Sequence, residues 1–253
     1  MKVVYSPAHL LHNPEVEFLL SSSYSPFEHA GRAEKIRETL AADKAFEFVS
    51  PTAWGTEPIT KIHNPGLLKF LSTAWADYQR EVKQVREVVP DIFFKSNLRE
   101  SMGGRVEPES VCGKLGWWCF ETTTPLTVGT YEAARGAVDV AMSATKIVLD
   151  GAKNSYGLCR PPGHHATTDL YGGYCFFNNA AIVAHHVAST TGTKVTVLDV
   201  DYHHGNGTQQ IFYERDDVQF VSLHGDPARA YPYFTGYIDE VGSGKGRGST
   251  LNV

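Results

Sequence analysis

Several stretches of the chain repeat apolar residues every three to four positions, which is the period of an amphipathic helix. The clearest pattern predicts a helix over Thr130–Asp150, with Gly151 at the position expected for a C-terminal cap. Weaker patterns of the same kind predict helices over Ala30–Ala41, Thr60–Trp75 and Asn179–Ser189.

Two other runs, Lys194–Leu198 and Val218–Leu223, are rich in β-branched residues and apolar almost throughout. This pattern is typical of strands that are covered on both faces. Met1–Ser6 also reads as a strand that enters the fold. Helices that alternate with such strands predict an α/β fold with a central parallel sheet. In folds of this kind, ligands bind beyond the carboxyl ends of the strands.

The segment of residues 88–129 has no steady period and is rich in glycine, proline, glutamate and aromatic residues. A loop of this length in a compact domain is usually a functional loop or an interface. We therefore expect a long loop here. Trp117 and Trp118 within it are equally compatible with dimer contacts and with a place in the core.

The composition limits the class of protein. A chain of 253 residues with 42% hydrophobic and 20% charged residues fits one soluble globular domain. Its formal charge of −5 argues against a nucleic-acid backbone as the main partner. We find no signal peptide and no run long enough for a membrane helix. The four cysteines lack CxxC spacing, so we expect no disulfide framework and no cysteine zinc site, and a cytoplasmic location is the simplest.

The densest group of chemically active side chains follows the first of the two apolar runs. Along an extended chain, Asp199, Asp201 and His203 would point to the same side. A neighbouring carboxylate and imidazole suit zinc or another divalent first-row metal. Alternatively, these residues only end the strand and cap the next helix. Burying so many ionisable groups without a counter-ion is unfavourable, which favours the metal site.

A second motif, Arg160–His165, contains two prolines and a glycine that predict a rigid turn presenting two adjacent histidines. Near a metal, His164 and His165 could divide the proton transfers, one as a neutral base and the other as a cation. Taken alone, the motif is equally compatible with a structural role.

Two further motifs lie later in the chain. In Gly172–Asn179, the glycines would let a substrate approach the backbone, and Tyr174 offers a flat apolar wall. A turn followed by core aromatics is an equally good interpretation. Ser222–Pro227 ends the second apolar run, at the same edge as the metal cluster if the sheet is parallel.

The motifs RPPGHH, GGYCFFNNAA, VLDVDYHHGNGTQ and SLHGDP, in this order, resemble the histone deacetylase superfamily, most closely its bacterial acetylpolyamine amidohydrolase branch. The segments YSPAHLLHNP and PFEHAGRAEKI extend the resemblance over essentially all of the chain. The resemblance implies that residues 1–253 form a single deacetylase domain with an arginase/deacetylase-like, three-layer α/β/α fold.

The resemblance also implies zinc-dependent hydrolysis of an acetyl amide. Asp201 and His203 would ligate one zinc ion, which lowers the pKa of its bound water to about 7. His164 and His165 would form the catalytic pair, with His165 as the general base. The implied substrates are acetylated polyamines or related small acetylated amines, with acetyl-lysine also open.

Further residues around this pair take roles from the same resemblance. Asp199 would orient His164. Asn206 would be the partner of His165, and because it is neutral it should leave His165 less basic than a carboxylate would. Gly173 would accept a hydrogen bond from the substrate amide N–H, while Tyr174 and Tyr231 would wall a narrow tunnel.

A structural potassium ion is also implied, held by Asp199, Ser222 and backbone carbonyls that include that of Leu223. A second potassium site would draw on the backbone carbonyls of Phe212, Arg215 and Val218.

In the branch that the chain resembles, the long loop mediates dimerisation, and its acidic residues hold the cationic substrate. The resemblance therefore implies a homodimer through residues 88–129. Two of the acidic positions are Cys112 and Thr123 here, and the nearest acids are Glu107, Glu109 and Glu121.

The resemblance breaks at the end of the chain. Members of the family take a third zinc ligand, an aspartate, and an oxyanion-stabilising tyrosine from beyond GSGKGRGSTLNV, and neither is present. We therefore expect a domain that lacks its last strands and helices and exposes a sheet edge. One alternative is a catalytically inactive binding or assembly module. Another, an arginase-like enzyme with paired manganese ions, is disfavoured by the tandem histidines and the single ligand cluster.

Overall fold

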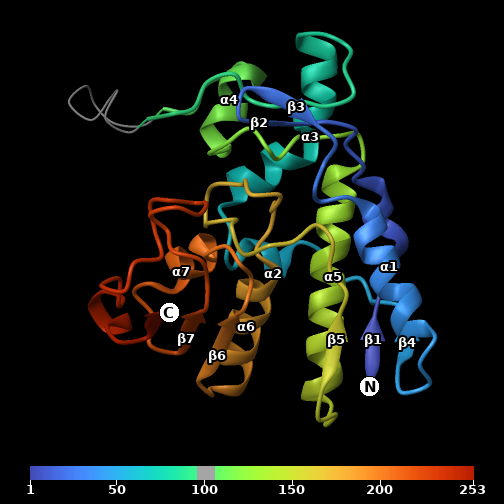
Figure 1. Cartoon of the computed structure of the whole chain (residues 1–253), viewed down its shortest axis with the longest axis vertical. Coiled ribbons are helices and arrows are strands. Elements are labelled where there is room, and N and C mark those ends of the chain that lie inside the picture. Colours follow the sequence, from blue (N-terminus) through green and yellow to red (C-terminus); the bar gives the residue numbers. More distant parts are fainter. Residues whose placement is uncertain (96–105) are drawn as a thin grey trace.

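The computed structural model describes residues 1–95 and 106–253. Its strands form two parallel three-stranded sheets and a short antiparallel hairpin (Figure 1). The first sheet has the order β4-β1-β5, with strands β1 (Lys2–Val4), β4 (Glu47–Val49) and β5 (Ser155–Gly157). The second has the order β6-β7-β8, with strands β6 (Val195–Asp199), β7 (Val218–Ser222) and β8 (Thr250–Asn252). The hairpin pairs β2 (Glu17–Leu19) with β3 (Ser22–Tyr24).

The helices alternate with these strands along the chain. They are α1 (Ala30–Ala41), α2 (Glu57–Thr60), α3 (Pro65–Glu81), α4 (Val111–Trp118), α5 (Thr130–Leu149), α6 (Asn179–Thr191) and α7 (Asn206–Phe212), with 3₁₀ helices η1 (Pro7–Leu11) and η3 (Gly244–Gly246). The α/β class and the helices predicted over Ala30–Ala41, Thr130–Asp150 and Asn179–Ser189 are therefore confirmed. Among the described residues, no helix has the length and apolar character to cross a membrane.

The parallel strands do not join into one central sheet. β5 pairs with β1 and β6 pairs with β7, and Figure 1 shows these two strands on the sides where the sheets face each other. Among the described residues, neither strand has a second strand partner there. The chain thus forms parallel sheets, but in two parts.

The prediction that β6 is covered on both faces is wrong. Val195 and Val197 pack toward the hydrophobic core, on the side of α6, whereas Leu198 is 60% exposed and Val200, just after the strand, is 70% exposed. No described element covers this second face. An apolar run therefore identified the strand correctly but did not show that both of its faces are buried.

Two predictions of local structure need correction. The helix predicted over Thr60–Trp75 corresponds to α3, which begins at Pro65 and extends to Glu81, while Thr60 ends the short helix α2. Asn64 caps the start of α3 by accepting a hydrogen bond from Gly66 N–H, and Pro65 follows as the first helical residue. The expected long loop contains α4, whose buried residues Val111, Leu115 and Trp118 follow a helical period. Residues 96–105 of that loop lie outside the described residues.

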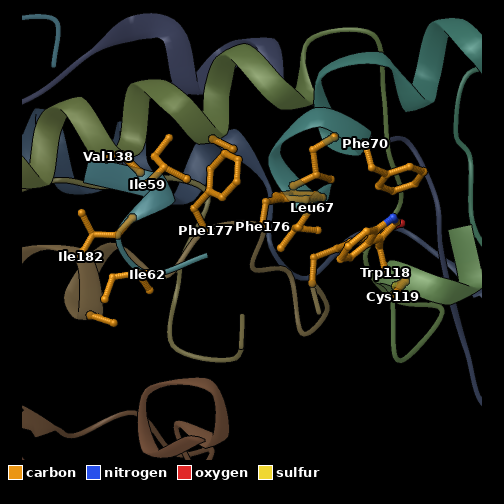
Figure 2. Packing of buried hydrophobic residues seen from close by; sticks show 14 of the residues in the cluster. Ile59, Ile62, Leu67, Phe70, Trp118, Cys119, Val138, Phe176, Phe177 and Ile182 are labelled. Atoms are coloured by element: carbon orange, nitrogen blue, oxygen red, sulfur yellow. The ribbon is translucent and has the colours of Figure 1, made fainter. Parts of the chain in front are cut away.

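One hydrophobic cluster joins α3, α4, α5 and α6 (Figure 2). Figure 2 shows Phe176 and Phe177 in its middle, with Ile182 on one side and Phe70 and Trp118 on the other. Trp118 is therefore a core residue. The four cysteines are free.

Candidate active site

The candidate site lies beyond the carboxyl ends of β6 and β7, where the loop of residues 160–175 meets the turn of residues 200–205. The N-terminus of α7 holds the histidine loop in place, since the N–H groups of Gly207 and Thr208 donate to the His164 carbonyl over 2.9 and 3.1 Å. The loop is thus anchored to the same segment that carries the predicted metal ligands.

Each imidazole of the histidine pair has its own partner. His164 Nδ1 lies 2.9 Å from Asp199 Oδ2, and His165 Nδ1 lies 2.7 Å from Asn206 Oδ1. The two rings are 4.0 Å apart between centroids. Because a carboxylate or amide oxygen accepts, both Nδ1 atoms donate, and a neutral imidazole held in this way has the lone pair that a base requires on Nε2.

The surroundings lower the pKa values of both His165 and Asp199, but for different reasons. Burial, reinforced by the neighbouring His164, holds the pKa of His165 well below its usual value, so this imidazole is neutral at physiological pH. Burial alone would raise the pKa of Asp199, but the hydrogen bond and charge of His164 outweigh it and the pKa lies below its usual value. The site therefore combines a neutral buried imidazole with an ionised carboxylate behind its neighbour.

The predicted metal ligands lie side by side. Asp201 Oδ1 is 3.4 Å from His203 Nδ1, and their side chains are 52% and 44% exposed. The strand alternation expected to align them ends at Asp199, because residues 200–205 are not a strand. Two successive turns align them instead: Asp201 N–H donates to Asp199 Oδ1 over 3.1 Å, and His203 N–H donates to Asp201 Oδ1 over 2.8 Å.

One oxygen and one nitrogen ligand side by side suit a zinc ion, but a catalytic zinc normally takes three protein ligands. Within residues 1–95 and 106–253, no group of three or more His, Cys, Asp and Glu side chains is placed to hold a metal ion. These residues therefore fit two positions of a zinc site. The His203 ring lies 6.2 Å from that of His165, so both pairs face one site.

Gly173, Tyr174 and Tyr231 surround His165. A Cβ on Gly173 would lie 2.3 Å from His165 Cδ2, so only glycine lets this backbone lie against the ring. Tyr231 packs edge-on to His165, with 4.9 Å between ring centroids. Tyr174 donates its hydroxyl to Glu17 Oε1 over 3.3 Å. Tyr231 thus lies beside the histidine pair, whereas the Tyr174 side chain contacts Glu17.

The residues predicted to hold potassium are placed in two groups. Asp199 and Ser222 are register partners in β6 and β7, and Leu223 N–H donates to the Asp199 carbonyl over 2.9 Å. Ser222 Oγ also lies 2.8 Å from His224 Nδ1. The second group spans the end of α7 and the start of β7, where Arg215 N–H donates to the Phe212 carbonyl over 2.9 Å and Val218 begins the strand.

Sequence reasoning missed three residues that support the site. His63 spans the loop behind the histidines: its Nδ1 lies 2.8 Å from the Thr167 carbonyl, and its Nε2 accepts from Asn178 N–H over 2.8 Å. Glu17 is 1% exposed beside Tyr174, and Thr124 accepts from Tyr174 N–H over 2.7 Å. None lies in a motif, and only spatial proximity identifies them.

Comparison with known proteins gives a consistent result. The family model described as the histone deacetylase domain matches residues 26–253. The chain is 42% identical to acetylpolyamine amidohydrolase 2 of Pseudomonas aeruginosa and 41% identical to acetylpolyamine amidohydrolase of Mycoplana ramosa, in each case over 100% of this chain and 72% of the relative. The crystal structure of acetylpolyamine aminohydrolase from Burkholderia pseudomallei superposes with a TM-score of 0.89 at 35% identity, covering 100% of this chain and 71% of that one.

Proposed function

Because the chain belongs to the histone deacetylase domain family, we propose that it is a zinc-dependent amidohydrolase that removes acetyl groups from acetylated polyamines or related acetylated amines. The observation that carries the proposal is the meeting of two pairs in one site. A neutral, buried His165 lies beside Asp201 and His203, two exposed side chains of the kinds that ligate zinc. Amide hydrolysis needs a base and an electrophile in this proximity.

Asp201 and His203 would hold the zinc ion. When bound, zinc supplies polarisation of the acetyl carbonyl and acidification of a water molecule. His165 Nε2 takes the proton of the attacking water, since Asn206 keeps its Nδ1 protonated. His165 then passes this proton to the departing amine nitrogen, beside His164, which Asp199 orients. Acetate and a free amine are the products.

The substrate amide would enter between Tyr174 and Tyr231, with its N–H donated to the Gly173 carbonyl. Carboxylates next to Tyr174 support a cationic substrate. Burial, and to a smaller extent the charges of Glu121 and Glu28, raise the pKa of Glu17, and an ammonium group beside them would relieve this repulsion.

Of the three acids considered as substitutes for the loop carboxylates, Glu121 is the one at the site. Its Oε1 accepts from Gly173 N–H over 2.9 Å. Glu107 instead accepts from Trp118 Nε1–H over 2.9 Å, and Glu109 lines a small pocket between α3 and α4. We also expect a homodimer formed through residues 88–129.

One observation favours a second candidate function, a binding or assembly module without turnover. Among the described residues, Asp201 and His203 have no third ligand beside them. Two ligands would hold zinc weakly, and such a module would bind an acetylated amine without hydrolysing it.

Metal analysis of the purified chain after incubation with zinc, combined with amine release from N-acetylputrescine, separates these functions. We expect about one zinc ion per chain, hydrolysis by the wild type, and loss of hydrolysis but not of zinc in His165→Ala. Binding of N-acetylputrescine without zinc or hydrolysis would support the module. Two manganese ions per chain with urea release would support an arginase-like enzyme.

A further inference from the structure

The turn beside His165 holds a backbone conformation that a tyrosine rarely adopts. Gly172 and Cys175 exchange two backbone hydrogen bonds of 3.0 Å across it. Its central residues have φ angles of 58° at Gly173 and 66° at Tyr174. Two positive φ angles are the pattern of a type I′ turn, which favours glycine, asparagine and aspartate. At a bulky residue this conformation is strained, so surrounding contacts must hold Tyr174 there.

A carboxylate and a hydroxyl supply those contacts. In such a turn, the N–H groups of both central residues point away from the hairpin bonds. Gly173 N–H donates to Glu121 Oε1 over 2.9 Å, and Tyr174 N–H donates to Thr124 Oγ1 over 2.7 Å. The buried Thr124 hydroxyl in turn donates to Glu121 Oε1. Both N–H groups are therefore bound, directly or through Thr124, to one carboxylate.

The hydrogen bond from Tyr174 N–H to Thr124 also affects the Gly173 carbonyl. This carbonyl and the Tyr174 N–H belong to the same peptide group. A hydrogen bond that ends on a carboxylate is stronger than a neutral one, and successive hydrogen bonds polarise one another. Polarisation of the Tyr174 N–H by Thr124 and Glu121 increases the negative charge on the Gly173 oxygen. That oxygen becomes a better acceptor.

We propose that Glu121 is a positioning residue that, through Thr124 and Tyr174 N–H, fixes and polarises the Gly173 carbonyl so that the site prefers acetyl compounds bearing an N–H. The inference rests on the proposed function, in which this carbonyl accepts the substrate amide N–H. The position is sensitive because the Gly173 backbone lies directly against His165. The Gly173 carbonyl held in this way favours the binding of secondary amides over that of esters, which have no N–H to donate.

Two probes that differ at one atom test the inference. N-acetylputrescine carries the N–H, and the O-acetyl ester of 4-aminobutanol has oxygen in its place. Their affinities are measured by NMR titration of the zinc-free chain, where no hydrolysis intervenes. We expect Glu121→Gln and Thr124→Val to weaken amide binding about fivefold to tenfold, the effect of one hydrogen bond. Ester binding should change less than about twofold.

Thr124→Ser keeps the hydroxyl and should restore the wild-type preference. Glu107→Gln is the matched control, since Glu107 contacts Trp118 and not the turn. Hydrogen exchange at the Gly173 and Tyr174 amides should accelerate in Glu121→Gln and Thr124→Val. In the zinc-loaded chain, KM for the amide should rise with little change in kcat.

The outcomes separate the inference from the proposed function. An amide-selective loss of affinity, rescued by Thr124→Ser, supports the inference even if the chain hydrolyses nothing, in which case only the proposed function fails. Equal weakening of amide and ester would mean that Glu121 merely stabilises the fold, and it overturns the inference. Wild-type protein that binds neither probe, or that binds both equally, also overturns it.

Discussion

His164 and His165 lie in a loop that is hydrogen-bonded to neighbouring elements, whereas Asp201 and His203 project from a turn beyond the end of β6. His165 is 4% exposed, and both imidazoles have fixed oxygen partners. The side chains of Asp201 and His203 are 52% and 44% exposed, with 3.4 Å between Oδ1 and Nδ1. The same site thus has a buried half and an exposed half.

The difference follows from what each half requires. A general base works only in a defined orientation and protonation state, so the fold itself must supply its partners. Metal ligands can become ordered when the metal binds, so the fold need only keep them adjacent. Burying a carboxylate without a counter-ion would also be unfavourable. The histidine half therefore contributes to folding, and the ligand half contributes mainly to binding.

The largest expected effect comes from removing a ligand. Asp201→Ala or His203→Ala should lower zinc affinity by more than the ~10–100-fold typical of an outer-shell partner. Unfolding free energy without metal should change by less than about 0.5 kcal/mol in His203→Ala, as is usual for exposed side chains. In Asp201→Ala it should fall by about 1 kcal/mol, because this variant also loses the hydrogen bond from His203 N–H. Metal analysis and urea unfolding measure the two effects. If either variant kept its zinc and its activity, the site assignment would be wrong.

A smaller effect, on the buried half, comes from Gly173→Ala. The new Cβ would lie 2.3 Å from His165 Cδ2 at a φ of 58°. Gly192→Ala is the matched control, because its φ is 68° but nothing lies within 4 Å of the added Cβ.

We expect Gly192→Ala to cost about 1 kcal/mol for the left-handed backbone alone. Gly173→Ala should cost about 1–3 kcal/mol more, because the His165 ring must move. Urea unfolding gives the difference between the two variants. Equal destabilisation would show that the turn does not contact His165 as described.

The sequence predicted the chemically active side chains of both halves better than the residues that support them. The tandem histidines and the Asp201–His203 cluster stand in short motifs, so their proximity within each pair follows from local spacing. Asp199 and Asn206, the partners of the two histidines, could be assigned only from the resemblance to the family. His63, Glu17 and Thr124 reach the site from distant segments, and no local pattern in the sequence identifies such contacts.

The fold shows the same limit. Helical periods located α5 and α6, which bury residues along most of their length, and also α1, of which only Ala33 is buried. The sequence pattern missed α4, because the helix is short and glycines at 113 and 116 are unfavourable in a helix interior. It also overstated the burial of β6. An apolar run reports what a strand could bury, and the tertiary arrangement decides which faces are covered.

The smallest expected effect concerns the pH dependence of the buried half through His63. Burial lowers the pKa of His63 to about 4, while in the unfolded chain it lies near 6.5. Between these values the unfolded chain binds a proton that the folded chain does not, so stability falls as pH drops from 6.5 toward 4. Each pH unit in this window removes at most about 1.4 kcal/mol through this residue.

His63→Gln, which can still donate to the Thr167 carbonyl and accept from Asn178 N–H, should lose this part of the pH dependence. His12, whose pKa burial lowers to about 3, acts in the same direction and leaves a residual slope in the variant. His29→Gln is the exposed control. Urea unfolding at pH 7, 6 and 5 should therefore give a slope for His63→Gln that is lower than the wild type's by about 1 kcal/mol per pH unit. Parallel slopes would mean that His63 is protonated as easily in the folded loop as in the unfolded chain, and the loop would then not depend on its neutral form.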